Sequence, residues 1–190
     1  YSEARRYHEM VAVSGTRYLD EPGTQARDLR DAFTDDDGSV LFTSLWGTLG
    51  EGVSYDGDDA RTVVVLGVPY PHLDDRMEAV QDAYQSAFGE SEDDHRESSN
   101  DDAGWRYAVE IPTVRKTRQA VGRVVRSPSD FGARILLDKR YTEAAEMEMH
   151  DYAVRGRFPP EERREMVDIG PEKLKFALLN FYQDMDGYDG

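Results

Sequence analysis

Apolar residues in this chain form short runs that alternate with helical stripes. Three runs rich in Val, Ile and Leu, at residues 40–46, 62–67 and 133–137, have the length and β-branched content of buried strands. Residues 25–33, before the first run, and residues 75–88, between the second and the third, carry apolar side chains at helical spacing. Strands that alternate with helices predict an α/β fold with a mostly parallel central sheet and helices on both faces.

Weaker patterns predict further elements. Residues 2–9 resemble the end of a helix, and residues 10–13 and 107–111 have strand-like composition. Thr24 is placed to cap the helix at 25–33, while the Asp20 to Gly23 segment is interpreted as a structural turn.

The C-terminal part, residues 141–190, is expected to be a helical extension. Pro160 and Pro171 each stand where a helix would begin. The second helix has an apolar stripe made of Leu174, Leu178, Phe181 and Met185. Because the sequence shows no internal repeat and its 190 residues suffice for one core, we expect a single domain over residues 1–190.

Charge changes this picture in two ways. The chain has 39 acidic and 23 basic residues, only four of them Lys, and a net charge of -16. Such a surface is typical of proteins in high salt, where a Debye length of about 3 Å screens repulsion and close Arg contacts can still hold nucleic acid. Residues 89–104 contain seven acids and one Arg, which predicts a solvated, mobile insertion.

Several kinds of site are excluded or not indicated. The sequence has no Cys, so it can form no disulfide, thiolate zinc site or iron-sulfur cluster from its own residues. The four His show no metal-binding spacing. There is no signal peptide and no apolar run of about 18 residues, so a cytoplasmic location is expected.

One basic stretch interrupts the acidic sequence. Residues 113–126, TVRKTRQAVGRVVR, carry five positive charges and no acid, which indicates a bound anion, with phosphate as the leading candidate. The stretch is predicted to be a helix that begins after Pro112, and Gln119, Arg123 and Arg126 are spaced to share one face. A solvated basic helix face is the alternative.

Four motifs together resemble the second motor domain of XPD-type DNA helicases in superfamily 2. Residues 119–126, QAVGRVVR, match the motif VI pattern Q-x-x-G-R-x-x-R. Residues 44–57, which include a glycine-rich loop, resemble the motif V region, and GVPYP at 67–71 and DFGARILLDKRY at 130–141 resemble neighbouring segments. The resemblance extends to the mid-150s and is faint in the C-terminal helices.

The resemblance implies a RecA-like three-layer sandwich within an ATP-driven 5'-to-3' DNA helicase, with ATP held between two RecA-like domains. Together with the acidic composition, it points to a halophilic archaeal source. The phosphate loop G-x-x-x-x-G-K-[ST] is absent from this sequence, so the magnesium-binding acids, phosphate loop and iron-sulfur cluster are expected in a first motor domain outside it. The N-terminal strand that carries motif IV in this family is expected to be truncated here, and this chain alone is expected to be inactive.

The resemblance also implies roles for individual residues. Arg123 and Arg126 would act as an arginine-finger pair, Gln119 would help to sense the nucleotide, and Gly122 would allow close packing of the helix. For Arg123 the alternative is a structural salt bridge.

The motif V region would contact both ligands. Glu51 and Gly52 would lie near the nucleotide, although Ser54 stands where the family often has Asp. The residues expected to face single-stranded DNA are Thr43, Ser44, Trp46 and Thr48. Trp46 would either stack on a base or cap the core.

Two other functional interpretations stay open. The chain resembles DinG-type helicases and other superfamily 2 translocases next most closely, and a non-catalytic RecA-like module that binds nucleic acid or a protein is the alternative class. Arg115, Lys116 and Arg118 have no implied role beyond balancing nearby acids. Repair of damaged DNA is an expectation that comes from the family.

Overall fold

A computed structural model describes residues 1–47, 49, 55, 59–89, 103–124, 131–149 and 152–186. The chain divides into two compact units. Unit 1 comprises Tyr1–Val63 and Gln119–Ile135, and unit 2 comprises Val64–Arg118 and Leu136–Gly190. The strands pair two by two, as β1-β2 and β3-β4, within the part of the chain that is described.

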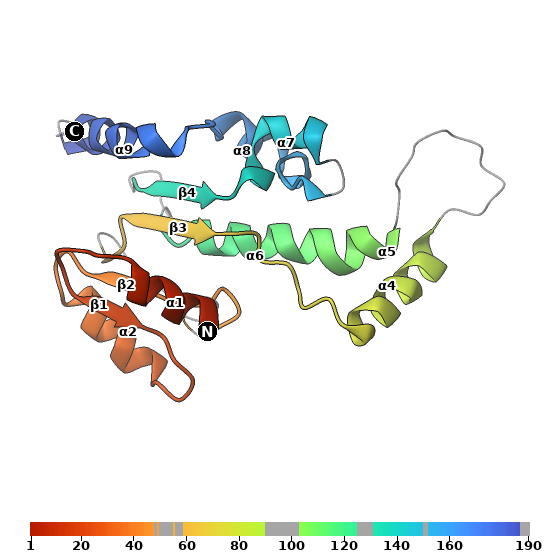
Figure 1. The fold of residues 1–190 in the computed structure, drawn as a ribbon, viewed down its shortest axis with the longest axis horizontal. Coiled ribbons are helices and arrows are strands. Elements are labelled where there is room, and N and C mark those ends of the chain that lie inside the picture. The colour runs from red at the N-terminus through yellow and green to blue at the C-terminus, as the bar shows by residue number, and fades with distance from the viewer. Residues whose placement is uncertain are drawn as a thin grey trace. The chain divides into compact units, whose positions relative to one another are not determined.

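Unit 1 begins with a βαβ arrangement preceded by a helix (Figure 1). The elements are α1 (Ser2–Met10), β1 (Arg17–Leu19), α2 (Ala26–Thr34) and β2 (Val40–Phe42). β1 and β2 are parallel, and their paired residues run from Arg17↔Val40 to Leu19↔Phe42. Parallel strands need a crossover connection, which α2 provides.

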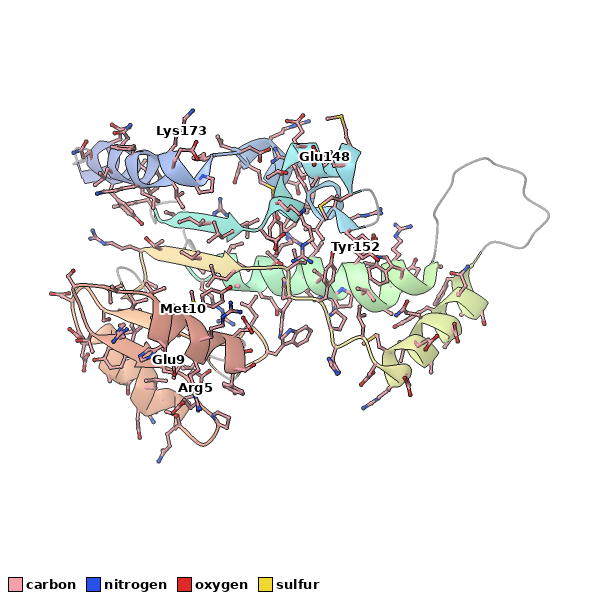
Figure 2. All side chains as sticks on the ribbon, viewed as in Figure 1. Arg5, Glu9, Met10, Glu148, Tyr152 and Lys173 are labelled. Atoms are coloured by element: carbon pink, nitrogen blue, oxygen red, sulfur yellow. The ribbon has the colours of Figure 1, made fainter. Side chains whose placement is uncertain are left out.

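Aromatic rings join these elements. Phe33 on α2 meets Tyr18 and Tyr55 edge to face, with ring centroids 6.3 Å and 5.8 Å apart. His8 meets Phe42 in the same geometry at 5.5 Å. Figure 2 shows Arg5 on α1, whose Nη2 lies 2.5 Å from Glu21 Oε1. The short strands are thus held mainly by side chains of the flanking helices.

Three details of the predicted N-terminal half are wrong. Residues 11–13 follow α1 without forming a strand. The residue that caps α2 is Gln25, not Thr24, and it makes no side-chain capping bond. β2 ends at Phe42 instead of residue 46, because the chain enters a hydrogen-bonded turn after Thr43.

The second sheet agrees with the prediction in its strands but not in their burial. β3 (Thr62–Leu66) and β4 (Ala133–Leu137) pair with each other, and their arrows point the same way in Figure 1. Val65 is buried, whereas Val64, Leu66 and Leu137 are exposed, so the prediction that these strands are buried throughout is wrong.

Unit 2 contains the longest helices. α4 (Asp75–Phe88) has the predicted bounds and is capped by Asp74, whose Oδ1 accepts from the Met77 N–H at 2.9 Å. α4 packs on α5 (Ala103–Trp105). Most of the predicted acidic insertion, residues 90–102, lies outside the described residues.

The strand predicted at 107–111 is wrong. Arg106–Glu110 form a π-helical turn, labelled η2, that continues directly into α6 (Ile111–Val121). Pro112 explains the geometry, because it lacks an N–H and its ring crowds the carbonyl four residues earlier. A π turn widens the helix at such a point.

The core of unit 2 is formed by Val114, Tyr141, Val154 and Phe158. The elements that follow β4 surround it: η3 (Lys139–Tyr141), α7 (Glu143–Glu148), η5 (Arg155–Arg157) and α8 (Pro160–Glu165). Figure 2 labels Glu148, the last residue of α7, and Lys173 near the start of α9.

The last helix, α9 (Pro171–Asp186), begins at the predicted proline. Its predicted apolar stripe is half-buried at all four positions. No helix among the described residues has both the length and the apolar content needed to cross a bilayer.

Candidate functional site

The carboxyl ends of β1 and β2 bring Asp20 and Thr43 together. Since the strands are parallel and Leu19 pairs with Phe42, the next residue of each strand lies at the same edge of the sheet. The Asp20 N–H donates to the Phe42 carbonyl at 2.9 Å, and the Thr43 hydroxyl donates to Asp20 Oδ2 at 2.7 Å. Asp20 is only 3% exposed, so its carboxylate depends on such donors.

A tight turn follows Thr43. The Gly47 N–H donates to the Ser44 carbonyl at 2.8 Å, and Ser44 Oγ accepts from the Trp46 N–H at 3.3 Å. A Cβ placed on Gly47 would lie 2.9 Å from Asp20 Oδ2, which is closer than real Cβ contacts. Residues 43–47, called the β2 turn below, therefore fold over the Asp20 carboxylate and require glycine at the last position.

Trp46 lies on the β2 turn with 52% of its surface exposed. A half-exposed side chain is compatible with both predictions for Trp46, stacking on a base and capping the core. Leu49, three residues later, is 1% exposed.

Tyr55 connects this edge to the basic stretch. Its side chain is buried, and burial raises the pKa of its hydroxyl. The positive charge of Arg123 is the largest effect that lowers this pKa, whereas the charge of Asp20 raises it further. Arg123 and Asp20 thus each lie within electrostatic range of Tyr55 inside unit 1.

The predicted helical face of Gln119 and Arg123 is wrong. α6 ends at Val121, and the Arg123 N–H donates to the Ala120 carbonyl at 3.2 Å in the turn that follows. Glycine disfavours a helix by about 1 kcal/mol relative to alanine, so Gly122 accounts for the ending. Gln119 is exposed at the last turn of α6, and Arg123 is half-buried beyond it.

Four of the predicted site residues lie outside the described residues: Thr48, Glu51, Gly52 and Arg126. Their roles stay predictions. Among the described ones, the structure places Thr43, Ser44 and Trp46 together on the β2 turn and Gln119, Gly122 and Arg123 together at the end of α6.

The remaining basic residues of the stretch differ from one another. Arg118 Nη2 lies 2.7 Å from Glu162 Oε1, so this arginine balances an acid, as the sequence predicts. Lys116 is buried, and burial lowers its pKa, which contradicts a fully solvated basic face. Arg115 is exposed.

Sequence reasoning missed Asp20 and Tyr55. The sequence places Asp20 in a structural turn, and the structure shows that it is buried at the carboxyl edge of a parallel strand pair. An acid directly after a strand is the signal that could have marked it, because ligands of open α/β sheets bind beyond the carboxyl ends of strands. Tyr55 has no comparable sequence signal.

The side chains of this chain cannot ligate the implied iron-sulfur cluster, but they suit the implied nucleotide. No group of three or more His, Asp and Glu within the described ranges could hold a metal ion, and no thiolate exists for an iron-sulfur cluster. The residues therefore do not fit the cluster. Guanidinium groups such as that of Arg123 do suit a nucleotide phosphate, because their planar fork binds its oxygens at two points.

Residues 3–152 match the family model described as the helicase C-terminal domain. The chain belongs to the helicase C-terminal domain family. This helicase C-terminal domain is 33% identical over 109 residues to the regulator of telomere elongation helicase 1 homolog of Caenorhabditis elegans, which covers 56% of the chain and 10% of that relative. It is 31% identical over 105 residues to the Fanconi anemia group J protein homolog of Gallus gallus, covering 55% of the chain and 8% of the relative.

The helicase C-terminal domain thus spans about a tenth of the length of these curated relatives. A solved structure titled XPD helicase superposes on it with a TM-score of 0.57 and 23% sequence identity, covering 78% of this chain and 25% of that one. This likeness concerns the fold, and it confirms an α/β fold with parallel strands that agrees with the predicted RecA-like class.

Proposed function

We propose that this helicase C-terminal domain is the second motor domain of an ATP-dependent 5'-to-3' DNA helicase of the XPD type. Family membership supports the helicase class. The electrostatic effect of Arg123 on Tyr55 supports the proposal further, because it couples the motif VI segment to the motif V segment within one compact unit.

Arg123 and Arg126 would act on the γ-phosphate of ATP. Phosphoryl transfer builds negative charge on the phosphate oxygens, and a guanidinium can bind two of them at once. Gln119, at the exposed end of α6, would help to sense the nucleotide. Gly122 ends the helix in front of Arg123, and Glu51 and Gly52 would approach the nucleotide from the motif V side.

The cofactors divide between this chain and the rest of the protein. Bound ATP with Mg²⁺ supplies the phosphoryl group, and the first RecA-like domain would hold most of it. The iron-sulfur cluster would also belong to that part, because this chain lacks thiolates. Without these parts, the chain alone would neither hydrolyse ATP nor unwind DNA.

Single-stranded DNA would run across the β2 turn. Exposed Trp46 offers a ring on which a base can stack, and Ser44 offers a hydroxyl to the backbone without reading the sequence. Thr48 would extend the same track.

The acidic composition and net charge of -16 suit high salt, and this supports a source in a halophilic archaeon. A cytoplasmic location and one domain over residues 1–190 are part of the same proposal.

The proposal is tested with the full-length protein in molar KCl. We expect oligo-dT to stimulate ATP hydrolysis and a 5' overhang, but not a 3' overhang, to permit unwinding of a duplex. The isolated 190-residue chain serves as the control and should show neither activity. Unwinding from 3' overhangs alone would contradict the XPD type, and absence of DNA-dependent ATP hydrolysis would contradict the motor.

A further inference from the structure

Asp20 is a buried acid, and the proposed helicase function assigns it no role. Its backbone N–H extends the pairing of β1 with β2, and its Oδ2 accepts the Thr43 hydroxyl at 2.7 Å. Removing a carboxylate from water is costly unless it is hydrogen-bonded, and this one is only 3% exposed. A buried acid at the edge of a loop therefore needs a structural or functional reason.

The bond to Asp20 changes what Thr43 can do. A threonine hydroxyl has one proton to donate, and Thr43 gives it to Asp20. Thr43 therefore has no proton left to donate to a DNA phosphate. Ser44 differs, because its Oγ accepts from the Trp46 N–H and keeps its own proton for another partner.

Close packing fixes the other end of the β2 turn. A Cβ on Gly47 would meet Asp20 Oδ2 at 2.9 Å, the Ser44 carbonyl at 3.1 Å and the Tyr1 hydroxyl at 3.2 Å. Asp20 thus contacts both the first and the last residue of the turn. Between these two points the chain presents Ser44 and Trp46.

We infer that Asp20 is a positioning residue, which holds both ends of the β2 turn so that Ser44 and Trp46 meet single-stranded DNA. The inference rests on the proposed function, since it assigns the turn to the DNA track. Asp20 itself touches no DNA. Its carboxylate fixes one conformation of the glycine-containing β2 turn. Less conformational entropy is then lost when DNA binds.

The test is a double-mutant cycle in the full-length protein, with oligo-dT affinity measured at fixed molar salt. Thr43→Val removes the donor and keeps the side-chain shape, Asp20→Leu removes the acceptor at similar size, and Thr43→Ser keeps the donor. We expect Thr43→Val and Asp20→Leu each to weaken affinity by roughly five- to tenfold. The double variant should be no weaker than either single variant, and Thr43→Ser should bind like the wild type.

Other outcomes overturn the inference. If Thr43 contacts DNA directly, Asp20→Leu will bind as tightly as the wild type while Thr43→Val binds weakly. Additive losses, or no loss in either variant, would also contradict the inference. If Asp20→Leu does not fold, as judged by thermal melting, Gly47→Ala decides. This variant crowds Asp20 while keeping the Thr43 hydroxyl, and wild-type affinity in a folded Gly47→Ala protein overturns the inference.

The wild-type protein separates this inference from the proposed function. If the wild type neither binds oligo-dT nor hydrolyses ATP, the proposed function fails. If the wild type does both and the variants behave like it, only the role of Asp20 fails.

Discussion

Arg118 and Glu162 form a two-point ion pair, in which Arg118 Nε lies 2.8 Å and 3.1 Å from the two carboxylate oxygens. This pair divides the basic stretch at 113–126. Arg118 and Glu162 belong to unit 2, whereas Arg123 acts on Tyr55 in unit 1. Arg118 therefore balances an acid within unit 2.

Replacing Arg118 should affect stability slightly and activity not at all. The Arg118 and Glu162 side chains are 48% and 30% exposed, and ion pairs this open to solvent contribute about 0–1 kcal/mol. We expect Arg118→Ala to lower the urea midpoint a little and to leave the ATP turnover of the full-length protein unchanged. Glu162→Gln, which removes the other charge of the same ion pair, is the matched variant. A tenfold loss of turnover in Arg118→Ala would place this arginine in the nucleotide site instead.

The Tyr141 hydroxyl should stabilise unit 2. Tyr141 is 4% exposed, and its hydroxyl lies 3.3 Å from the Gly67 carbonyl and 3.2 Å from Thr117 Oγ1. Tyr141→Phe should lower the free energy of unfolding by about 1 kcal/mol, because buried partners lose a hydrogen bond. Urea unfolding measures this, with Tyr152→Phe as the exposed control. Equal free energies of unfolding for Tyr141→Phe and Tyr152→Phe would contradict a stabilising role of the Tyr141 hydroxyl.

Alkaline pH should weaken the native state through the same residue. Burial raises the pKa of Tyr141 to about 12, from 10.0 in an unfolded chain. Above pH 10 the unfolded chain loses this proton first, so the stabilisation present below about pH 10 is lost as the pH rises toward about 12. Tyr141→Phe should therefore lose less stability than the wild type between pH 9.5 and 11.5, roughly the interval between these two pKa values. An identical loss of stability in the wild type and in Tyr141→Phe would contradict the assignment of this pH dependence to Tyr141.

The exposed indole of Trp46 should report on DNA binding. The chain has two Trp, and Trp105→Phe leaves Trp46 as its only one. We expect oligo-dT to quench tryptophan fluorescence in that variant, since bases stack on aromatic rings. Because the full-length protein can contain further Trp, the control is Trp46→Phe, in which the quenching should disappear. Unchanged quenching in Trp46→Phe would remove Trp46 from the DNA track.

Elements with strong local signals were predictable from the sequence. α4 is capped by Asp74 and has an apolar stripe, and β4 is a short run in which four of five residues are apolar, so both have the predicted bounds. The segment at 107–111 failed because a short apolar run does not distinguish a strand from a buried helix. Ala108 and Val109 are buried on a helix there, in a geometry that depends on Pro112.

The candidate site was predictable only in part. The motif VI pattern selects Arg123, but it cannot show that Gly122 ends the helix before it. The hydrogen bond between Thr43 and Asp20 joins residues distant in sequence, and it exists only once β1 and β2 pair. The electrostatic effect of Arg123 on Tyr55 also joins distant residues. Local spacing carries no information about such contacts.

The most direct test of the central claim is single-turnover ATP hydrolysis by the full-length protein with saturating oligo-dT. Arg126→Ala and Arg123→Ala should each lower the rate by roughly 10³-fold or more, the size expected for loss of an arginine finger, with little change in ATP affinity. Arg126→Lys should not restore the rate, because an ammonium lacks the two-point fork. Exposed Arg115 provides the control, and Arg115→Ala should hydrolyse ATP at the wild-type rate. Near-normal rates in both Arg126→Ala and Arg123→Ala would contradict the claim that this domain completes the ATP site.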